Sequence, residues 1–224
     1  MIKHFGKKFL IVCQIIFPCS WPLLSGCSTI PPQSLQSLNK SAAQAIYVHP
    51  TKKDSHKAFL SAWQKRGDSW HRVFFVSAVI GRNGLAASGE KKEGDGKTPS
   101  GTYPLGPAFG YAPSINTGLL YRQATDSDFW VDDVQSMQYN QWVSGTPDAK
   151  SFERMKRHDN LYQYGIVIGY NTLPVTAGAG SAIFMHVWRR YNNPTSGCVA
   201  VNQRYMRKIL LWLGRQYRPV IILE

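Results

Sequence analysis

The chain has 224 residues, 43% hydrophobic and 12% aromatic, which suits one domain with a sizeable core and a short additional segment. Only 17% of the residues are charged, and this excludes an intrinsically disordered protein. The formal net charge of +13 favours anionic surfaces such as lipid headgroups, acidic polymers or nucleic acid, although solubility alone also explains it.

The first 26 residues are organised like a secretory signal. Several lysines and no acidic residue precede a mostly apolar run over residues 9–24, which is too short and too interrupted for a membrane-spanning helix. The run ends in Leu-Ser-Gly-Cys27, which resembles a bacterial lipoprotein lipobox. That resemblance implies lipid on Cys27 and, with Ser28 next to it, a periplasmic protein anchored at the outer membrane. An ordinary cleaved signal peptide is the alternative.

This reading divides the chain into three parts. Residues 1–26 are the lipoprotein signal peptide, and residues 27–44 are the lipidated cysteine and a flexible tether rich in Ser, Gln, Pro and Asn. Residues 45–224 form the folded domain. Cys13 and Cys19 leave with the signal peptide, so Cys198 remains alone in an oxidising compartment, as either an inert buried thiol or a reactive one.

The first half of the domain begins with a predicted helix. Apolar residues at helical spacing, with Asp54 as a possible cap, predict a helix over residues 54–66. A β-rich run predicts a buried strand over residues 73–80, and a dense Gly/Pro turn occupies residues 93–101. Residues 106–150 are irregular and rich in aromatics, which either pack in the core or stack on sugars, and such a segment is often a lid or a substrate groove.

The second half predicts strands over residues 164–170, 181–188 and 219–223. Asn202 can cap a helix in which Met206, Ile209, Leu210 and Leu213 form an apolar stripe. The fold class is therefore mainly β, with a few short helices that include one near the C-terminus.

The chemistry concentrates between residues 185 and 201. Cys198 directly follows Gly197, and His186 lies twelve residues upstream on a predicted strand. A thiol needs a base to become a nucleophile, and a glycine lets the main chain approach a substrate closely. The amides of Gly197 and Cys198 could face the oxyanion of a tetrahedral intermediate. On composition alone, the alternative is equally favoured: Cys198 is a buried structural cysteine, and His186 has no functional relation to it.

The stretch resembles the catalytic motif of the YkuD-type L,D-transpeptidase family, in which a histidine at a strand end precedes a Ser/Thr-x-Gly-Cys element. Here these are His186 and the run Thr195-Ser196-Gly197-Cys198. The turn from Asp95 to Tyr103 resembles the family's upstream Asp-Gly-x-Thr-Pro-x-Gly-x-aromatic signature. The resemblance covers roughly residues 73–223 and implies a β-sandwich or mixed sheet of the family type.

The chain also departs from the family pattern. Ser196 stands where most members have His or another polar residue, Ala200 stands where an arginine is usual, and Val187 replaces the glycine after the histidine. Arg189 and Arg190 are candidates to supply the missing charge, and Thr195 and Ser196 are candidate substrate contacts.

The resemblance implies that Cys198 and His186 transfer an acyl group from a peptidoglycan stem peptide through a Cys198 thioester. An amine acceptor gives a 3-3 crosslink or an attached protein. An L,D-carboxypeptidase or amidase that uses water is one alternative, and a non-enzymatic wall-binding lipoprotein is another. We expect no metal, no organic cofactor and no nucleic-acid partner, since the other histidines lack ligand spacing and no recognition motif is present.

Overall fold

The computed structural model describes Met1 and residues 30–38 and 41–224. The predicted signal peptide and the predicted lipidation site Cys27 lie outside these residues. The elements in chain order are α1 (Gln33–Gln36), β1 (Gln44–Pro50), β2 (Lys57–Arg66), β3 (Ser69–Val79), β4 (Gly101–Gly110), β5 (Tyr121–Gln123), β6 (Asp128–Val131), β7 (Trp142–Ser144), β8 (Phe152–Arg154), β9 (Tyr164–Ile168), β10 (Phe184–Val187), β11 (Val199–Val201), α2 (Gln203–Trp212), the short 3-10 helix η1 (Arg215–Tyr217) and β12 (Val220–Leu223).

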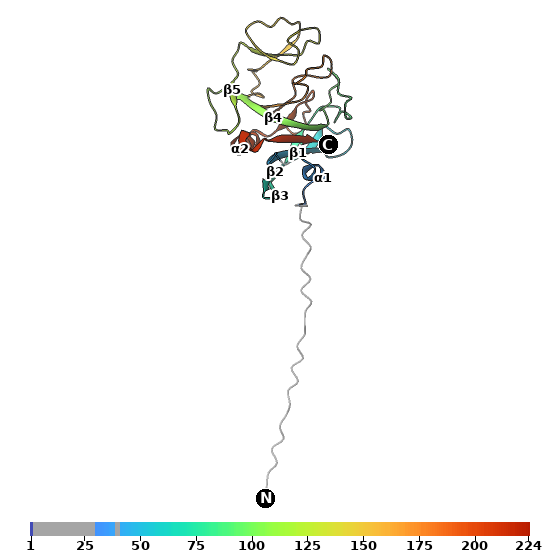
Figure 1. Ribbon diagram of the computed structural model, residues 1–224, viewed down its shortest axis with the longest axis vertical. Helices are drawn as coiled ribbons and strands as arrows, with labels where there is room; N and C mark the ends of the chain where they lie inside the picture. Colours follow the sequence, from blue (N-terminus) through green and yellow to red (C-terminus); the bar gives the residue numbers. More distant parts are fainter. Residues whose placement is uncertain (2–29, 39–40) are drawn as a thin grey trace.

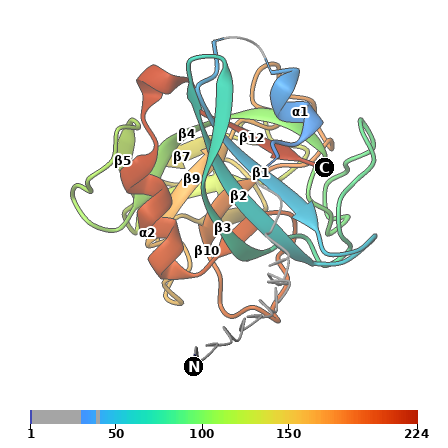
Figure 2. The same ribbon diagram turned by 90° about the horizontal axis from the view of Figure 1, so that it is seen from below.

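A mixed sheet closes on itself to form the body of the domain. Its order is β12-β1-β2-β3-β11-β10-β9-β4-β5, and β12 also pairs with β4, which joins the two sides into a ring. Most neighbours are antiparallel, whereas β1–β12, β10–β11 and β4–β5 are parallel. The predicted mainly β fold with a helix near the C-terminus is confirmed (Figures 1 and 2).

The main core fills the inside of this ring. Its largest members include Ile46, Leu60, Ile166 and Met185, and the apolar face of α2 completes it against β9 and β10. Asn202 caps α2 as predicted, because its side chain accepts a hydrogen bond of 2.9 Å from the Arg204 amide. The strands predicted around residues 73–80, 164–170, 181–188 and 219–223 are present as β3, β9, β10 and β12.

The predicted helix over residues 54–66 is wrong, because this segment forms strand β2. Ala58 and Ala62 face the core, whereas Phe59 stacks on Phe75 with ring centroids 5.0 Å apart on the other face. Trp63 is buried on that outer face against Leu35 of α1. A strand covered on both faces has apolar residues at spacings that also fit a helix, and this explains the misleading pattern.

The short helix α1 lies within the part of the chain predicted to be a tether. Its Leu35 is 1% exposed and packs with Ala45, Trp63 and Ile222 on the outer face of the sheet. The side chain of Ser34 also donates a hydrogen bond of 2.8 Å to Glu224. Residues 33–36 are therefore part of the folded body.

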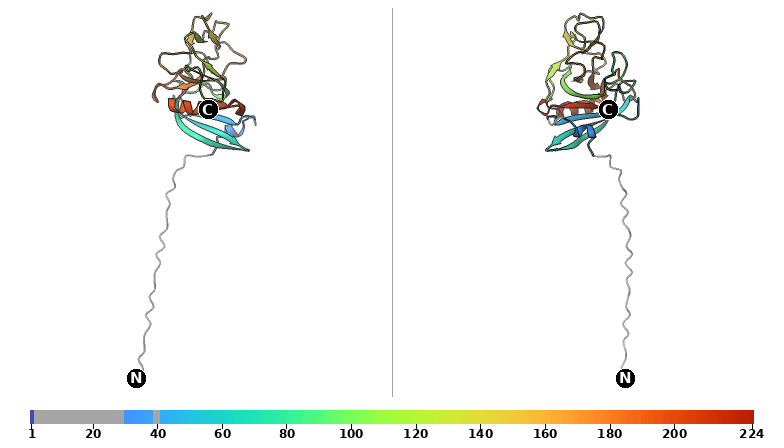
Figure 3. Two further views of the ribbon diagram at one scale, coloured as in Figure 1. Left: turned by 90° about the vertical axis from the view of Figure 1, so that its left-hand side faces the viewer. Right: turned by 45° about the vertical axis from the view of Figure 1, so that its right-hand side comes forward.

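The irregular middle of the chain builds a second layer over one end of the barrel. It carries a small sheet of order β7-β6-β8, which lies at the end of the molecule away from α1 (Figures 1 and 3). Its aromatics form a second core around Phe184, which meets Phe109, Trp130 and Tyr162 edge to face. Of the two roles open for these aromatics, core packing is the one observed for the buried members.

Candidate active site

Cys198 lies directly before β11, beneath the second layer. Only 7% of the residue is exposed, and it belongs to the aromatic core around Phe184. The thiol donates to the Ala182 carbonyl over 3.2 Å, and its sulfur accepts from the Phe184 amide over 3.4 Å. Phe184 begins β10 and Ala182 lies two residues before it, so this segment fixes the position of the sulfur.

The loop before Cys198 is fixed to the end of β3 by main-chain bonds. The Thr195 amide donates to the Ile80 carbonyl over 3.0 Å, and the Thr195 carbonyl accepts from the Arg82 amide over 2.9 Å. The Thr195 hydroxyl donates to the Cys198 carbonyl over 2.6 Å and accepts from the Gly197 amide over 3.2 Å. Thr195 thus holds the approach to the nucleophile, and one of the two amides proposed for the oxyanion is occupied in this resting arrangement.

The upstream glycine-rich turn packs directly against this loop. The Thr98 side chain is fully buried, donates to the Gly197 carbonyl over 2.7 Å and accepts from the Gly81 amide over 2.9 Å. Asp95 braces the turn by accepting hydrogen bonds of 2.8 Å from both the Lys91 side chain and the Lys97 amide. The two motifs that the sequence places far apart therefore form one unit.

Gly197 is closely packed against two neighbouring segments. A Cβ built on it would lie 3.0 Å from the Lys97 carbonyl oxygen and 3.1 Å from a methyl group of Ile183. Both contacts are tighter than ordinary van der Waals distances, so a side chain would press the upstream turn and β10 away from Cys198. A glycine keeps these segments together.

His186 lies on β10, where it is paired with Ala200 of β11. Its Nδ1 lies 2.8 Å from the Val187 carbonyl, which can only accept, so Nδ1 carries the proton and Nε2 keeps a lone pair. The Tyr162 ring meets the imidazole edge to face, with centroids 5.1 Å apart. A main-chain carbonyl therefore orients the imidazole, and sequence spacing does not reveal a main-chain partner of this kind.

The protonation states of the pair follow from their burial. Burial lowers the pKa of His186 to about 4, and the nearby Arg157 adds to this effect. Burial raises the pKa of the Cys198 thiol to about 12, with the Glu153 carboxylate as the next cause. The resting pair at neutral pH is a thiol and an uncharged imidazole rather than a thiolate and an imidazolium.

Two cavities open on either side of Cys198. The first, of about 230 Å³, is lined by Cys198, His186, Tyr162, Trp188, Ala200 and residues that include Glu153, Arg157, Arg189, Thr195 and Ser196. The second, of about 220 Å³, is lined by Cys198, Gly197, Ser196, Arg82, Lys91 and three acidic residues, which are Glu93, Asp132 and Glu153. Cys198, Ser196 and Glu153 lie on both.

The structure thus gathers most of the predicted site residues. Cys198, His186, Thr195, Ser196 and Arg189 line the first cavity, and Gly197 lines the second. Arg190 is exposed and is not among the residues that line either cavity.

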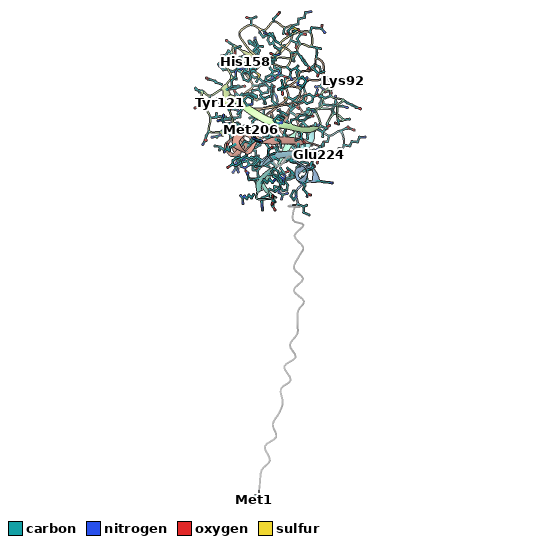
Figure 4. The ribbon with its side chains drawn as sticks, in the orientation of Figure 1. Met1, Lys92, Tyr121, His158, Met206 and Glu224 are labelled. Atoms are coloured by element: carbon teal, nitrogen blue, oxygen red, sulfur yellow. The ribbon has the colours of Figure 1, made fainter. Side chains whose placement is uncertain are left out.

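Three residues at the site had not been identified from the sequence. Tyr162 donates a hydrogen bond from its hydroxyl to Glu153, and Arg157 lies over the Tyr162 ring, 5.1 Å from its centroid. Burial raises the pKa of Glu153, while the Tyr162 hydrogen bond opposes that shift. Glu153 lies on β8, and Arg157 and Tyr162 lie in the loop between β8 and β9. Figure 4 labels His158, the neighbour of Arg157, in the upper part of the molecule. No spacing pattern links them to Cys198.

Residues 30–38 and 41–224 contain no group of three or more His, Cys, Asp or Glu side chains arranged to hold a metal ion. Within the same residues, no helix has both the length and the apolar character needed to cross a membrane.

Comparison with known proteins identifies the domain. The model of the L,D-transpeptidase catalytic domain, YkuD, matches residues 54–222. No curated protein is similar enough to count as a match. Among solved structures, the chain is similar to the helical cell shape determining protein Pgp2 from Campylobacter jejuni, with 16% identity, a TM-score of 0.45 and coverage of 81% of this chain and 47% of that one.

A second solved structure, Bd1075 from Bdellovibrio bacteriovorus, shows 17% identity and a TM-score of 0.42, with coverage of 82% of this chain and 48% of that one. The chain therefore spans about half the length of these two proteins. The family match covers most of the chain and includes the Cys198 loop, His186 and the upstream turn. The chain belongs to the YkuD family of L,D-transpeptidase catalytic domains.

Proposed function

We propose that this domain transfers acyl groups of peptidoglycan stem peptides through a thioester on Cys198. The observation that carries the proposal is the placement of Cys198 and His186 on one cavity, with His186 oriented by the Val187 carbonyl so that Nε2 is free to accept a proton. Family membership supplies the substrate class. A basic protein also suits a peptide that carries several carboxylates.

The neutral resting pair determines the first step. The thiol turns from the Ala182 carbonyl, and His186 Nε2 takes its proton as sulfur attacks the carbonyl carbon of the diaminopimelate residue. The tetrahedral oxyanion then collapses, the C–N bond breaks, and the imidazolium returns the proton to the leaving amine of D-alanine. The acyl group remains on Cys198 as a thioester.

The second step resolves the thioester. An amine of another stem peptide or of a protein attacks the acyl carbon, and His186 accepts the amine proton. As the new C–N bond forms, the C–S bond breaks, and the imidazolium returns the proton to sulfur, which restores the thiol. Water in place of the amine would give a trimmed tripeptide, which is the carboxypeptidase outcome. Glu153 borders both cavities and lies beside Cys198, so it is placed to meet either acceptor.

A direct test uses the full-length protein and two variants, Cys198→Ala and Cys198→Ser. Each is incubated with diaminopimelate-containing disaccharide tetrapeptide, and both the protein mass and the products are followed. We expect a Cys198-dependent adduct with loss of D-alanine, followed by crosslinked dimers. Tripeptide without dimers would show that water, and not an amine, resolves the thioester. The absence of both adduct and product would favour a wall-binding protein without catalytic activity.

We also propose that the protein is a lipoprotein of the periplasmic face of the outer membrane. The support is the resemblance of the sequence around Cys27 to a lipobox, together with Ser28 after it. Metabolic labelling with a palmitate analogue, compared between the natural chain and Cys27→Ser, tests this proposal. Equal labelling of the two proteins would refute lipidation at Cys27.

A further inference from the structure

One wall of the first cavity carries two arginines joined through a single aspartate. Arg157 donates through Nε to Asp159 Oδ1 over 2.9 Å and through Nη2 to Asp159 Oδ2 over 2.8 Å. Arg189 donates to the same Asp159 Oδ2 over 2.9 Å. The three residues come from the loop before β9 and the loop after β10, so the fold brings together two segments that are about 30 residues apart in the sequence.

This arginine pair, Arg157 and Arg189, carries more positive charge than its aspartate balances. Neither bond of Arg157 to Asp159 uses Nη1, so that nitrogen and its hydrogens stay available to a ligand. The Arg157 guanidinium is also fixed over the Tyr162 ring. An arginine held in this way loses little freedom when it binds an anion, and its planar group suits a carboxylate.

The two cavities beside Cys198 differ in the charge that they present. The first is lined by Arg157 and Arg189, and the second by Arg82 and Lys91 together with Glu93 and Asp132, while Glu153 lines both. Cationic side chains therefore outnumber acidic ones only around the first cavity, which favours a substrate carboxylate there. Ala200 also lines the first cavity, two residues after the nucleophile, and its methyl group leaves that wall without a charge of its own.

We propose that Arg157, held by Asp159 together with Arg189, binds a carboxylate of the donor peptide in the first cavity and sets donor specificity. The inference rests on the proposed function, because it assigns a substrate contact within the same site. Of the two arginines predicted from proximity in sequence, Arg189 belongs to this pair and Arg190 lines neither cavity, whereas Arg157 comes from a different loop.

The test compares three disaccharide tetrapeptides, one with free carboxylates, one with a C-terminal D-alaninamide and one amidated on the diaminopimelate side chain. Their affinities are measured by calorimetry on full-length Cys198→Ala, and kcat/KM is measured on the active protein. We expect one of the two amides to bind about 10- to 100-fold more weakly than the free peptide, and that amide identifies the carboxylate. Arg157→Gln should bind the free peptide more weakly by a similar factor. This variant should also bind the free peptide and that amide with equal affinity.

Two further variants keep the test decisive. Arg157→Lys retains the charge without the paired bonds to Asp159 and should fall between the parent and Arg157→Gln. Lys156→Gln removes a charge from the same loop at a residue that pairs with the exposed Asp126, and it should leave affinity unchanged. Thermal unfolding of every variant establishes that the fold is intact.

The outcomes separate this inference from the proposed function. Turnover that is insensitive to Arg157→Gln overturns the arginine contact and leaves acyl transfer standing. Arg157-dependent binding without turnover in the active protein supports the contact and overturns acyl transfer. No binding and no turnover with any of the three peptides overturns both.

Discussion

The side chain of Thr98 donates a hydrogen bond of 2.7 Å to the main-chain carbonyl of Gly197, 99 residues further along the chain. The same hydroxyl oxygen accepts a hydrogen bond from the Gly81 amide, so one buried group joins the end of β3, the upstream turn and the nucleophile loop. The threonine in the upstream signature therefore acts on Cys198 through the main chain, without touching substrate.

Replacing Thr98 by valine should destabilise the domain. The valine leaves the Gly81 amide and the Gly197 carbonyl without this partner in the interior, at a cost of about 1–3 kcal/mol. Urea denaturation measures the loss, and Thr98→Ser, which keeps the hydroxyl, is the matched control. A Thr98→Val protein as stable as the parent would contradict the role given to this hydrogen bond.

Alkylation of Cys198 by iodoacetamide should be slow at neutral pH, and its rate should rise without a plateau up to pH ~10. The reason is that the thiolate is the reactive form and the pKa of the thiol is raised to about 12. Glu153→Gln removes a negative charge that disfavours the thiolate, so it should lower the pKa and increase the rate at pH ~8 by roughly 3- to 10-fold. Intact-protein mass spectrometry gives the rates, with the exposed Asp126→Asn as control. A plateau near pH ~8.5 would show a thiol titrating like a free cysteine.

His186 should make the domain sensitive to acid. Its pKa falls from an ordinary 6.5 to about 4 on folding. Between these two pH values the imidazole is protonated in the unfolded chain and neutral in the folded chain. Stability is therefore fully present above pH 6.5 and is lost as the pH falls towards 4, by up to about 3 kcal/mol. The measurement is the difference in unfolding free energy between the parent and His186→Asn at pH ~7.5 and ~4.5. The same difference at both pH values would rule out this linkage.

Gly197→Ala should impair the site through packing. The new methyl group meets the Lys97 carbonyl and Ile183, and its accommodation should cost about 1–3 kcal/mol and shift Cys198. We expect kcat/KM for the tetrapeptide donor to fall by about 10-fold or more, because small displacements of a nucleophile are costly. Gly67→Ala, in the turn between β2 and β3, has open space but a φ of +58°, so its strain of about 1 kcal/mol makes it the control for a destabilised protein with an unaltered site. Equal activity of the two variants would count against the packing argument.

Local signals allowed much of the fold to be predicted. The cap at Asn202 and the apolar stripe that follows it identify α2, because both act within one helix. The error over residues 54–66 has a tertiary cause, since α1 covers the outer face of β2 and makes apolar residues favourable on both faces. Nothing within that segment reveals the covering helix.

The site was predictable only where its residues share a motif. His186 lies on β10 and Cys198 directly precedes β11, the strand paired with β10, so their closeness in sequence is preserved in space. Tyr162, Glu153 and Arg157 reach the site through the packing of the second layer, and the orienting group of His186 is a main-chain carbonyl that any residue at position 187 would provide. The sequence therefore predicts a nucleophile and a base that line one cavity, but it leaves their surroundings open.

The pairing of β12 with both β1 and β4 has a consequence for the order in which the domain is made. Residues 220–223 complete the ring, and until they pair, both neighbouring strands expose unsatisfied peptide groups. A chain still emerging from a ribosome or a translocation channel cannot close the barrel, and such long-range pairing is slow. We expect nascent chains stalled before residue 220 to be digested readily by protease and to depend on chaperones, whereas the released protein resists digestion.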